Sequence, residues 1–382
     1  MKKILQIPNY LYPHVGGIEQ VARDILWALK GEDVEQKIIC FNEDARDGMM
    51  ICRRKETAHD RVDGIEVVRC GCIAKIRSQS ISPRYPSELK KMIHDFSPDV
   101  IIFHYPNPYV AHWLLKYLPK DTKLFLYWHL DIVKQVLLRH LFEGQTQRLI
   151  ARADRVIATS PNYVEGSPWL CKAKAKCTVI PNCISTERLE KTPQAESIAR
   201  KIREENPDKI ICVSVGRHVK YKGITYLIQA AKQLDSRFLI YIIGNGEETE
   251  ALKQEARGID SIHFLGTVTD DELKGWLAAA DIFCFPSITK NEAFGLALAE
   301  AMYYEKPAVT FTIPGSGVNY VCLNGETGIE VPGGDAAAYA RAMKTLADDP
   351  EMRRRLGQNA RKRVEENFTS AIYREKILAV LR

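Results

Sequence analysis

Residues 209–223 read KIICVSVGRHVKYKG: an apolar run, a glycine and a loop that carries three cations. The apolar run is short and rich in β-branched residues, which is typical of a buried strand. Apolar residues then recur at helical spacing in YLIQAAKQL, residues 226–234, and a second apolar run, FLIYIIG, follows at residues 238–244. Strand, helix and strand in this order predict a parallel sheet covered by helices.

The same alternation runs through the whole chain and starts again near residue 184. A length of 382 residues also fits two domains. We therefore expect an α/β fold of two Rossmann-like domains, residues 1–183 and 184–367, with parallel sheets that face a central cleft and hold the ligand there. Residues 184–208, polar and with two prolines, are expected to be the linker and the entry to the second domain.

The composition is that of an ordinary globular protein, with 46% hydrophobic and 27% charged residues. Ten cysteines include no Cys-x-x-Cys pair, which excludes the common zinc motifs and argues against a disulfide framework. We expect free thiols in a reducing compartment. The chain has no apolar run of the length that spans a bilayer, and MKKILQIPNY lacks the apolar stretch of a signal peptide, so we expect a soluble cytoplasmic protein.

The basic excess of the chain lies in its first half. Up to Asn182 there are 27 basic and 20 acidic residues, against 27 and 28 from Cys183 on. Residues 133–176 carry eight basic and three acidic residues. In the leading part, residues 132–155, apolar residues recur at helical spacing with cations between them, which is typical either of a docking surface for anionic lipid or a phosphorylated acceptor, or of a solvated helix face. Nucleic acid is disfavoured, because no helix-turn-helix, RNA-recognition signature or basic tail is visible.

Two loops that follow predicted strands are candidate anion sites. Gly16 and Gly17 lie between the strand KKILQIP and a helix, so their backbone can approach an anion, although a glycine pair before a helix is often a plain turn. Arg217 and Lys222 follow the strand of residues 209–215 and suit a diphosphate, with a surface ion pair as the alternative.

The segment IIGNGEET, residues 242–249, begins like a dinucleotide fingerprint. Thr249 stands where the third glycine belongs, so the segment is a poor indication of NAD. It does predict a tight turn from Gly244 to Gly246 at the end of a strand.

The most specific segment is PSITKNEAFGLALAEAM, residues 286–302. Glu292 precedes the expected start of a helix at residues 293–295, and Glu300 lies two turns into that helix. Backbone N–H groups at this start can hold a phosphate, while the carboxylates accept hydrogen bonds from sugar hydroxyls. Two glutamates at this spacing alone mean little, but the preceding strand and the glycine make the combination specific.

His129 and Asp131 follow a predicted strand of the first domain, in YWHLD, residues 127–131. A single histidine is more often structural than functional. Its position at a strand end, facing the expected cleft, favours a functional role here.

Taken in order, several motifs resemble those of family 4 glycosyltransferases, which are retaining enzymes with the two-Rossmann GT-B fold. The matching motifs are PHVGGIEQ, YWHLDIVKQ, VIPN, VGRHVKYKG, IIGNGEE, HFLGTVTDDEL, PSITKNEAFGLALAEAM and NGETGIEVP. The resemblance extends from Lys3 to about Phe368. In detail the chain is similar to bacterial hexosyltransferases that build surface polysaccharides on lipid carriers, several of which use GDP-mannose.

The resemblance implies a role for each matching residue. Gly16 and Gly17 would approach the donor diphosphate, which Arg217 and Lys222 would bind and stabilise as the leaving group. Glu292 would hold hydroxyls of the donor sugar, Glu300 the ribose, and His129 would lie beside the reacting carbon. The implied donor-binding set also contains Gly246, Val268, Ala293, Phe294, Gly295 and Leu296.

The resemblance also implies that no metal or other cofactor is needed, and no Asp-x-Asp site is visible in the sequence. It implies a C-terminal helix at residues 368–382 that crosses back to the first domain. Two positions depart from the family pattern: Cys183 replaces the glycine of a Pro-Asn-Gly turn, and Glu305 stands where a glycine usually follows the helix that contains Glu300.

The sequence thus predicts a retaining glycosyltransferase that moves a hexose from GDP-mannose or a UDP-sugar to a hydroxyl of a lipid-linked saccharide or glycolipid, in the cytoplasm or at the inner face of the membrane. One alternative is a nucleotide-sugar epimerase of the same fold, which would need no acceptor. Another is a non-catalytic protein that binds sugar nucleotides. A phosphorylase would need a lysine-bound cofactor, for which no motif is visible.

Overall fold

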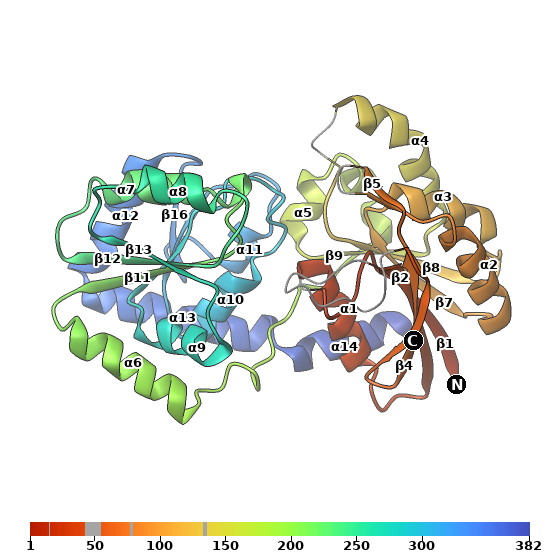
Figure 1. Ribbon diagram of the computed structural model, residues 1–382, viewed down its shortest axis with the longest axis horizontal. Coiled ribbons are helices and arrows are strands. Elements are labelled where there is room, and N and C mark those ends of the chain that lie inside the picture. Colours follow the sequence, from red (N-terminus) through yellow and green to blue (C-terminus); the bar gives the residue numbers. More distant parts are fainter. Residues whose placement is uncertain (15, 43–54, 77–78, 133–135) are drawn as a thin grey trace. The chain divides into compact units, whose positions relative to one another are not determined.

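The structure of the chain is a computed structural model that describes residues 1–14, 16–42, 55–76, 79–132 and 136–382, with the side chains of residues 136–141 excepted. The chain divides into two compact units. The N-terminal unit consists of residues 1–159, 167–180 and 373–382, and the C-terminal unit of residues 160–166 and 181–372. Each unit is built around its own sheet (Figure 1).

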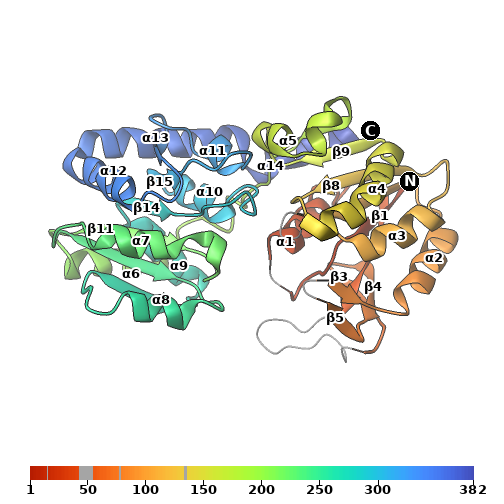
Figure 2. The same ribbon diagram turned by 90° about the horizontal axis from the view of Figure 1, so that it is seen from above.

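The sheet of the N-terminal unit has the strand order β10-β9-β8-β7-β1-β2-β4-β3, parallel throughout except for the antiparallel pair of β3 and β4 at one edge. Its strands are β1 (Lys2–Ile7), β2 (Val34–Asn42), β3 (Ala58–Val62), β4 (Ile65–Gly71), β7 (Val100–Tyr105), β8 (Lys123–Trp128), β9 (Arg155–Ala158) and β10 (Cys177–Val179). The helices of this unit are α1 (Gly17–Ala28), α2 (Tyr85–Phe96), α3 (Pro108–Tyr117), α4 (Val136–Arg152) and α14 (Ser370–Leu381), which cover the sheet (Figure 2). A separate hairpin is formed by β5 (Ala74–Ile76) and β6 (Gln79–Ile81).

The sheet of the C-terminal unit is parallel, in the order β13-β12-β11-β14-β15-β16. Its strands are β11 (Ile210–Val215), β12 (Phe238–Ile243), β13 (Ile262–Gly266), β14 (Ile282–Phe285), β15 (Ala308–Phe311) and β16 (Gly328–Val331). Its helices are α5 (Pro161–Gly166), α6 (Pro193–Glu205), α7 (Ile224–Ala231), α8 (Thr249–Glu255), α9 (Asp270–Ala279), α10 (Leu296–Tyr303), α11 (Val318–Val321), α12 (Ala336–Asp348) and α13 (Pro350–Asn367). Numbered along the chain, this is the order 3-2-1-4-5-6 of dinucleotide-binding folds, which hold ligands outside the carboxyl ends of the strands where the order reverses. Here the order reverses between β11 and β14.

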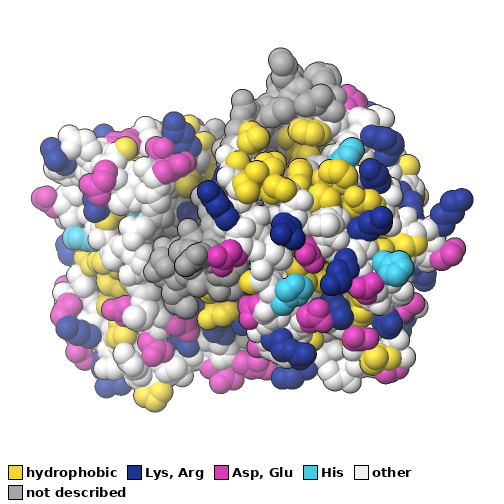
Figure 3. Space-filling model, turned by 45° about the vertical axis from the view of Figure 1, so that its right-hand side comes forward, with side chains coloured by type: hydrophobic (Ala, Val, Ile, Leu, Met, Phe, Trp, Pro, Cys, Tyr) yellow, Lys and Arg dark blue, Asp and Glu magenta, His cyan; other side chains and the backbone are white. Residues whose placement is uncertain are grey.

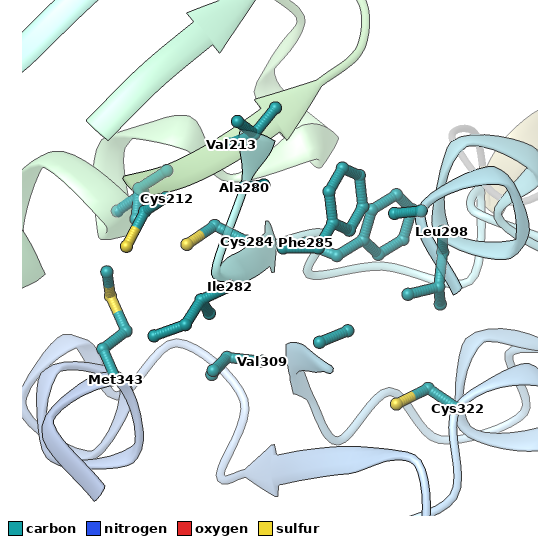
Figure 4. Packing of buried hydrophobic residues seen from close by; sticks show 14 of the residues in the cluster. Cys212, Val213, Ala280, Ile282, Cys284, Phe285, Leu298, Val309, Cys322 and Met343 are labelled. Carbon is teal, nitrogen blue, oxygen red and sulfur yellow. The ribbon is translucent and has the colours of Figure 1, made fainter. Parts of the chain in front are cut away.

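The core of the C-terminal unit anchors the segments that matter for function. In Figure 4 the sulfur atoms of Cys212 on β11, Cys284 on β14 and Met343 on α12 face one another in the middle of this core. Phe285 at the end of β14 lies beside Leu298 of α10, and both side chains are buried. This contact fixes the start of α10 against the carboxyl end of the sheet.

The predicted α/β fold with parallel sheets in two domains is confirmed. The prediction that residues 184–208 are a linker is wrong in part, because they contain α6. Thr192 caps this helix by accepting a hydrogen bond from the Ala195 N–H at 3.0 Å, and Pro193 occupies the first turn. The proline that was interpreted as a sign of a linker therefore begins a helix. The division of the chain falls after Ile180, and α14 passes from one unit to the other, with residues 373–382 in the N-terminal unit.

Glu305 occupies a backbone position that favours glycine. It follows α10 with a φ of +60°, in the left-handed region. Its N–H donates to the carbonyl of Met302 at 3.0 Å, and the Lys306 N–H donates to Ala301 at 3.1 Å, which is the pattern of a Schellman helix end. A side chain in this conformation is strained by roughly 1–2 kcal/mol.

We predict that Glu305→Gly raises the free energy of unfolding by about 0.5–1 kcal/mol, because the relief of strain exceeds the extra backbone entropy of glycine in the unfolded chain. Urea denaturation measures this change. Glu305→Ala is the matched control, since it removes the carboxylate, which lies 3.9 Å from Arg361, but keeps the strained backbone. A Glu305→Gly protein no more stable than Glu305→Ala would contradict the explanation.

Candidate active site

Two loops pack tightly at the carboxyl ends of β11 and β12. The Gly216 N–H donates to the carbonyl of Ile243 at 3.0 Å, and the His218 N–H donates to that of Asn245 at 3.0 Å. A Cβ atom on Gly246 would collide with the backbone of His218. The close approach of these two backbones thus requires a glycine at position 246, whether or not Gly246 binds the donor as predicted. Val268, at the end of the next strand along, is half-buried and packs against the core.

Lys222 and Glu292 form an ion pair beside these loops. The Lys222 Nζ bonds to Oε2 of Glu292, and the Ser287 hydroxyl donates to the same oxygen at 3.2 Å. The two charged side chains are only 15% and 12% exposed. The other carboxylate oxygen of Glu292 makes no hydrogen bond to any residue that the structure describes. The site therefore combines a held cation with an available acceptor oxygen.

Lys222 also borders a small pocket of about 10 Å³, which is lined by Gly216, Ser214 and Phe285 as well. That volume corresponds to a single water position. The Lys222 Nζ lies 5.2 Å from the centre of the Phe285 ring, so the ring face adds to the attraction that holds the ammonium in place.

The start of α10 presents free backbone donors next to Glu292. Gly295 caps the helix with a φ of +95°, and a Cβ atom there would press against Phe285 and Leu298. Within the described chain, the N–H groups of residues 294–296 have no hydrogen-bonding partner. Unpaired N–H groups at a helix start attract anions. The preceding turn is held by the Ser316 hydroxyl, which donates to the carbonyl of Glu292.

Arg217 differs from Lys222 in its surroundings. Its side chain is exposed and its guanidinium lies 3.4 Å from the Tyr221 hydroxyl. Among the residues that the structure describes, no carboxylate pairs with it. With the described residues, Arg217 therefore forms no surface ion pair of the kind considered as an alternative, whereas Lys222 has a partner that is largely buried.

Glu300 is bound by a residue that the sequence analysis did not single out. Arg188 bonds to Glu300 through one nitrogen and to Asp270 through the other, at 2.7 Å for Asp270. Burial raises the pKa of Glu300, and the Arg188 guanidinium opposes this effect. The only available signal was the position of Arg188 a few residues after the Pro181–Asn182 turn, which says nothing about a partner on α10.

Gly16 and Gly17 lie at the start of α1 in the N-terminal unit, as predicted from the sequence. The carboxylate of Glu19 lies where a Cβ atom on Gly16 would be, whereas the space beside Gly17 is open. Glu19, which the sequence analysis missed, already places a negative charge at this helix start, so an anion bound here would have to lie on the Gly17 side.

His129 follows β8 in the N-terminal unit and is 5% exposed. Its Nε2 lies 2.9 Å from Nδ1 of His104, on the neighbouring strand β7. Burial, together with His104, holds the pKa of His129 well below its usual value. Asp131 does not contact this imidazole; it accepts hydrogen bonds from the Trp128 indole at 3.0 Å and the Ser167 hydroxyl at 2.8 Å.

The basic segment of residues 133–176 is in part structural. The Lys176 Nζ donates to the carbonyls of Ile150, Ala151 and Ala153, at the end of α4. Arg152 donates to three carbonyls in residues 119–122. These two cations thus cap a helix and tie down a loop. The side chains of residues 133–141, on which the predicted lipid-docking face also depends, lie outside the described residues.

The part of the chain that the structure describes shows neither a metal-binding cluster nor a helix that could span a membrane. No group of three His, Cys, Asp or Glu side chains is placed to hold a metal ion, and no helix combines the length and apolar character that crossing a bilayer requires. That the protein needs no metal stays a prediction.

Comparison with known families decides the class of the protein. The model of "Glycosyltransferase Family 4" matches residues 15–188, and that of "Glycosyl transferases group 1" matches residues 195–363. The chain belongs to the family 4 glycosyltransferases. Among curated relatives of this glycosyltransferase, O-antigen chain mannosyltransferase C of Escherichia coli is 28% identical over 96% of this chain and 95% of its own length. D-rhamnosyltransferase WbpZ of Pseudomonas aeruginosa is 28% identical over 95% and 91%.

Solved structures agree on the fold. Sucrose-phosphate synthase from Thermosynechococcus elongatus superimposes with a TM-score of 0.79 at 20% identity, over 100% of this chain and 98% of its own. HepE of Anabaena, crystallised with UDP and glucose, gives 0.76 at 18% identity over 100% and 99%. At this level of identity the likeness establishes the GT-B fold alone.

Proposed function

We propose that this glycosyltransferase is a retaining enzyme that transfers a hexose from a nucleotide sugar to a hydroxyl of a lipid-linked saccharide or glycolipid, in the synthesis of a cell-surface polysaccharide. The relatives named for O-antigen mannosyl transfer and rhamnosyl transfer, matched over nearly their full lengths, support the substrate class. They are transferases, which favours transfer over the epimerase and the non-catalytic protein considered from the sequence.

The observation that carries the proposal is the Lys222–Glu292 ion pair at the start of α10. A nucleotide sugar presents a diphosphate next to a ring of hydroxyls. The Lys222 ammonium, the exposed Arg217 guanidinium and the N–H groups of residues 294–296 suit the diphosphate. The available oxygen of Glu292 suits a sugar hydroxyl.

The proposed reaction occurs on one face of the sugar. The bond between the anomeric carbon and the diphosphate oxygen breaks, and its electron pair stays on the diphosphate. The acceptor oxygen forms the new bond on the same face, and its proton passes to a diphosphate oxygen. Lys222 and Arg217 stabilise the negative charge that develops on the leaving group, so catalysis is mainly electrostatic stabilisation and positioning. No metal or cofactor takes part in this proposal.

We expect one of the four nucleotides UDP, GDP, ADP and dTDP to raise the unfolding temperature of the protein without added metal. A ligand at 100 times its dissociation constant adds about 2.7 kcal/mol to the free energy of unfolding.

The variant Arg188→Gln removes the cation that opposes the raised pKa of Glu300. The carboxyl of Glu300 then protonates at higher pH and accepts less well from the ribose. We predict that nucleotide affinity falls more steeply as the pH is lowered in this variant than in the wild type.

Arg200→Gln, on the exposed side of α6, is the matched control and is expected to bind like the wild type. Parallel pH profiles for Arg188→Gln and the wild type would exclude the assigned role of Glu300. Absence of stabilisation by all four nucleotides would overturn the donor site as a whole.

Arg217→Ala and Lys222→Ala are each expected to lower turnover about 10²–10³-fold, the usual effect of removing one group that stabilises transition-state charge. The assay measures sugar transfer in EDTA, and the anomeric configuration of the product by NMR. Lys220→Ala removes an exposed cation from the same loop and is expected to keep wild-type turnover. Near-wild-type turnover of Arg217→Ala or Lys222→Ala, or an inverted product, would refute the mechanism.

A membrane contact would bring the enzyme to a lipid-linked acceptor. The hairpin of β5 and β6 presents Ile73 and Ile76, 57% and 64% exposed, on either side of Lys75. On the face drawn in Figure 3, hydrophobic side chains gather on the N-terminal unit and are bordered by Lys and Arg. Apolar side chains beside cations suit the surface of an anionic bilayer.

We predict that the protein co-sediments with vesicles that contain anionic lipid, and that Ile76→Glu weakens this binding several-fold. Substitution of Trp27 by Glu, on α1 and 40% exposed, serves as the control for a general effect of added charge. Equal sedimentation of Ile76→Glu and wild type would exclude the hairpin as the contact.

A further inference from the structure

The loop after β11 and the turn after β12 approach each other backbone to backbone. A Cβ atom on Gly244 would collide with the carbonyl of Gly216, and one on Gly246 would collide with that of His218. Gly244 also has a φ of +124°, which favours glycine. In the fingerprint of dinucleotide-binding folds, the glycines let the backbone approach a pyrophosphate. Here the two glycines let one loop approach the other.

Thr249, which stands where the third glycine of that fingerprint belongs, joins the turn to the loop through one hydroxyl group. Its Oγ1 accepts from the N–H of Gly246 at 2.9 Å and lies 2.9 Å from the carbonyl of the same residue. The Gly246 N–H is therefore occupied within the turn and does not face an anion. Oγ1 of Thr249 also lies 2.9 Å from Nδ1 of His218, whose side chain is fully buried.

The direction of these hydrogen bonds follows from the protons available. Nε2 of His218 is buried and has no hydrogen-bonding partner among the residues that the structure describes. A neutral imidazole carries one proton, and a buried N–H without a partner is rare, so the proton belongs on Nδ1. Nδ1 then donates to Thr249, whose hydroxyl donates to the carbonyl of Gly246. Burial lowers the pKa of His218, and Lys253 acts in the same direction, so neither favours an imidazolium.

The main chain of His218 is held by the same turn. Its N–H donates to the carbonyl of Asn245 at 3.0 Å, and its carbonyl accepts from the N–H of Glu248 at 3.0 Å. The residue before it is Arg217, whose exposed guanidinium lies 3.4 Å from the Tyr221 hydroxyl and pairs with no carboxylate of the described chain. The direction of this guanidinium therefore depends mainly on the backbone from which the side chain starts.

We propose that His218 and Thr249 are positioning residues, which together fix the backbone beside Arg217 and so direct its guanidinium at the donor diphosphate before the nucleotide binds. The inference rests on the proposed function for the presence of that diphosphate. A group fixed in its binding position in advance loses less conformational entropy when the ligand arrives. Lys222 needs no such support, because Glu292 already holds it.

Calorimetric titration with the nucleoside diphosphate that stabilises the protein tests this role without an acceptor. Arg217→Ala is expected to weaken binding about tenfold, the usual effect of losing one hydrogen bond to a charged group. Thr249→Val removes the hydroxyl at nearly constant volume and is expected to weaken binding about fivefold, within the range of coupling between neighbouring residues. In the Arg217→Ala protein, Thr249→Val is expected to have no further effect, because the positioning pair acts only through the guanidinium.

Three variants serve as controls. Thr249→Ser keeps the hydroxyl and is expected to bind like the wild type. Thr345→Val removes an exposed hydroxyl of α12, which donates to the carbonyl of Arg341 at 3.0 Å, and is also expected to bind like the wild type. In the Lys220→Ala protein, Thr249→Val is expected to keep its full effect. Additive losses from Thr249→Val and Arg217→Ala would indicate a general structural effect and overturn the positioning role.

The histidine is tested by two replacements and by NMR. His218→Asn can place an amide group near the former Nδ1 and is expected to retain most of the binding, whereas His218→Leu is expected to match Thr249→Val. In wild-type protein labelled with ¹⁵N-histidine, long-range ¹H–¹⁵N correlation at pH 7.5 is expected to show a single Nδ1–H form for His218, assigned with the help of His218→Asn. Any other form in the wild type overturns the inference, even if the variants do not fold.

The outcomes distinguish this inference from the proposed function. If the nucleotide binds the wild type and binds Thr249→Val and His218→Leu equally well, the proposed function stands and the inference is overturned. If His218 shows the Nδ1–H form but no nucleotide binds, the proposed donor site is wrong, and the positioning of Arg217 toward a diphosphate is wrong with it.

Discussion

The ion pair between Lys222 and Glu292 connects the two segments on which the donor side of this enzyme depends. Lys222 comes from the loop after β11 and Glu292 from the turn before α10, 70 positions later in the chain. Breaking a largely buried pair by removing one partner leaves a charge without compensation, at a cost of several kcal/mol. The pair therefore fixes the distance between a group suited to the diphosphate and a group suited to the sugar. The loops after β12 and the packing of α10 on Phe285 are arranged around that distance.

The fold was predictable because its signals are local. The strand of residues 238–243 is an unbroken apolar run, and that of residues 210–215 is apolar except for Ser214. The start of α10 is marked by Gly295, whose left-handed backbone conformation favours glycine. The wrong prediction at α6 concerned a local signal too. The polar composition of residues 184–208 indicated a linker, but a proline that directly follows a capping threonine is typical of a helix start.

The site was predictable only as far as its residues lie next to strand ends. Arg188 meets Glu300 across 112 positions, and nothing in either local pattern encodes that contact. The basic segment shows the opposite case: its charge was visible, but the use of Lys176 to cap α4 depends on a contact made only after folding. Electrostatic partners of this kind come from topology, so a sequence pattern can name the candidate charges but not their partners.

Helix α14 has a consequence for the order in which the protein can be completed. Residues 373–382 belong to the N-terminal unit, where Arg374 binds backbone carbonyls at the end of α1 and the Lys2 side chain bonds to the carbonyl of Leu381. Strand β1 is thus covered by a helix that is synthesised only after the whole of the C-terminal unit. During synthesis the N-terminal unit lacks this helix until the C-terminal unit has been made.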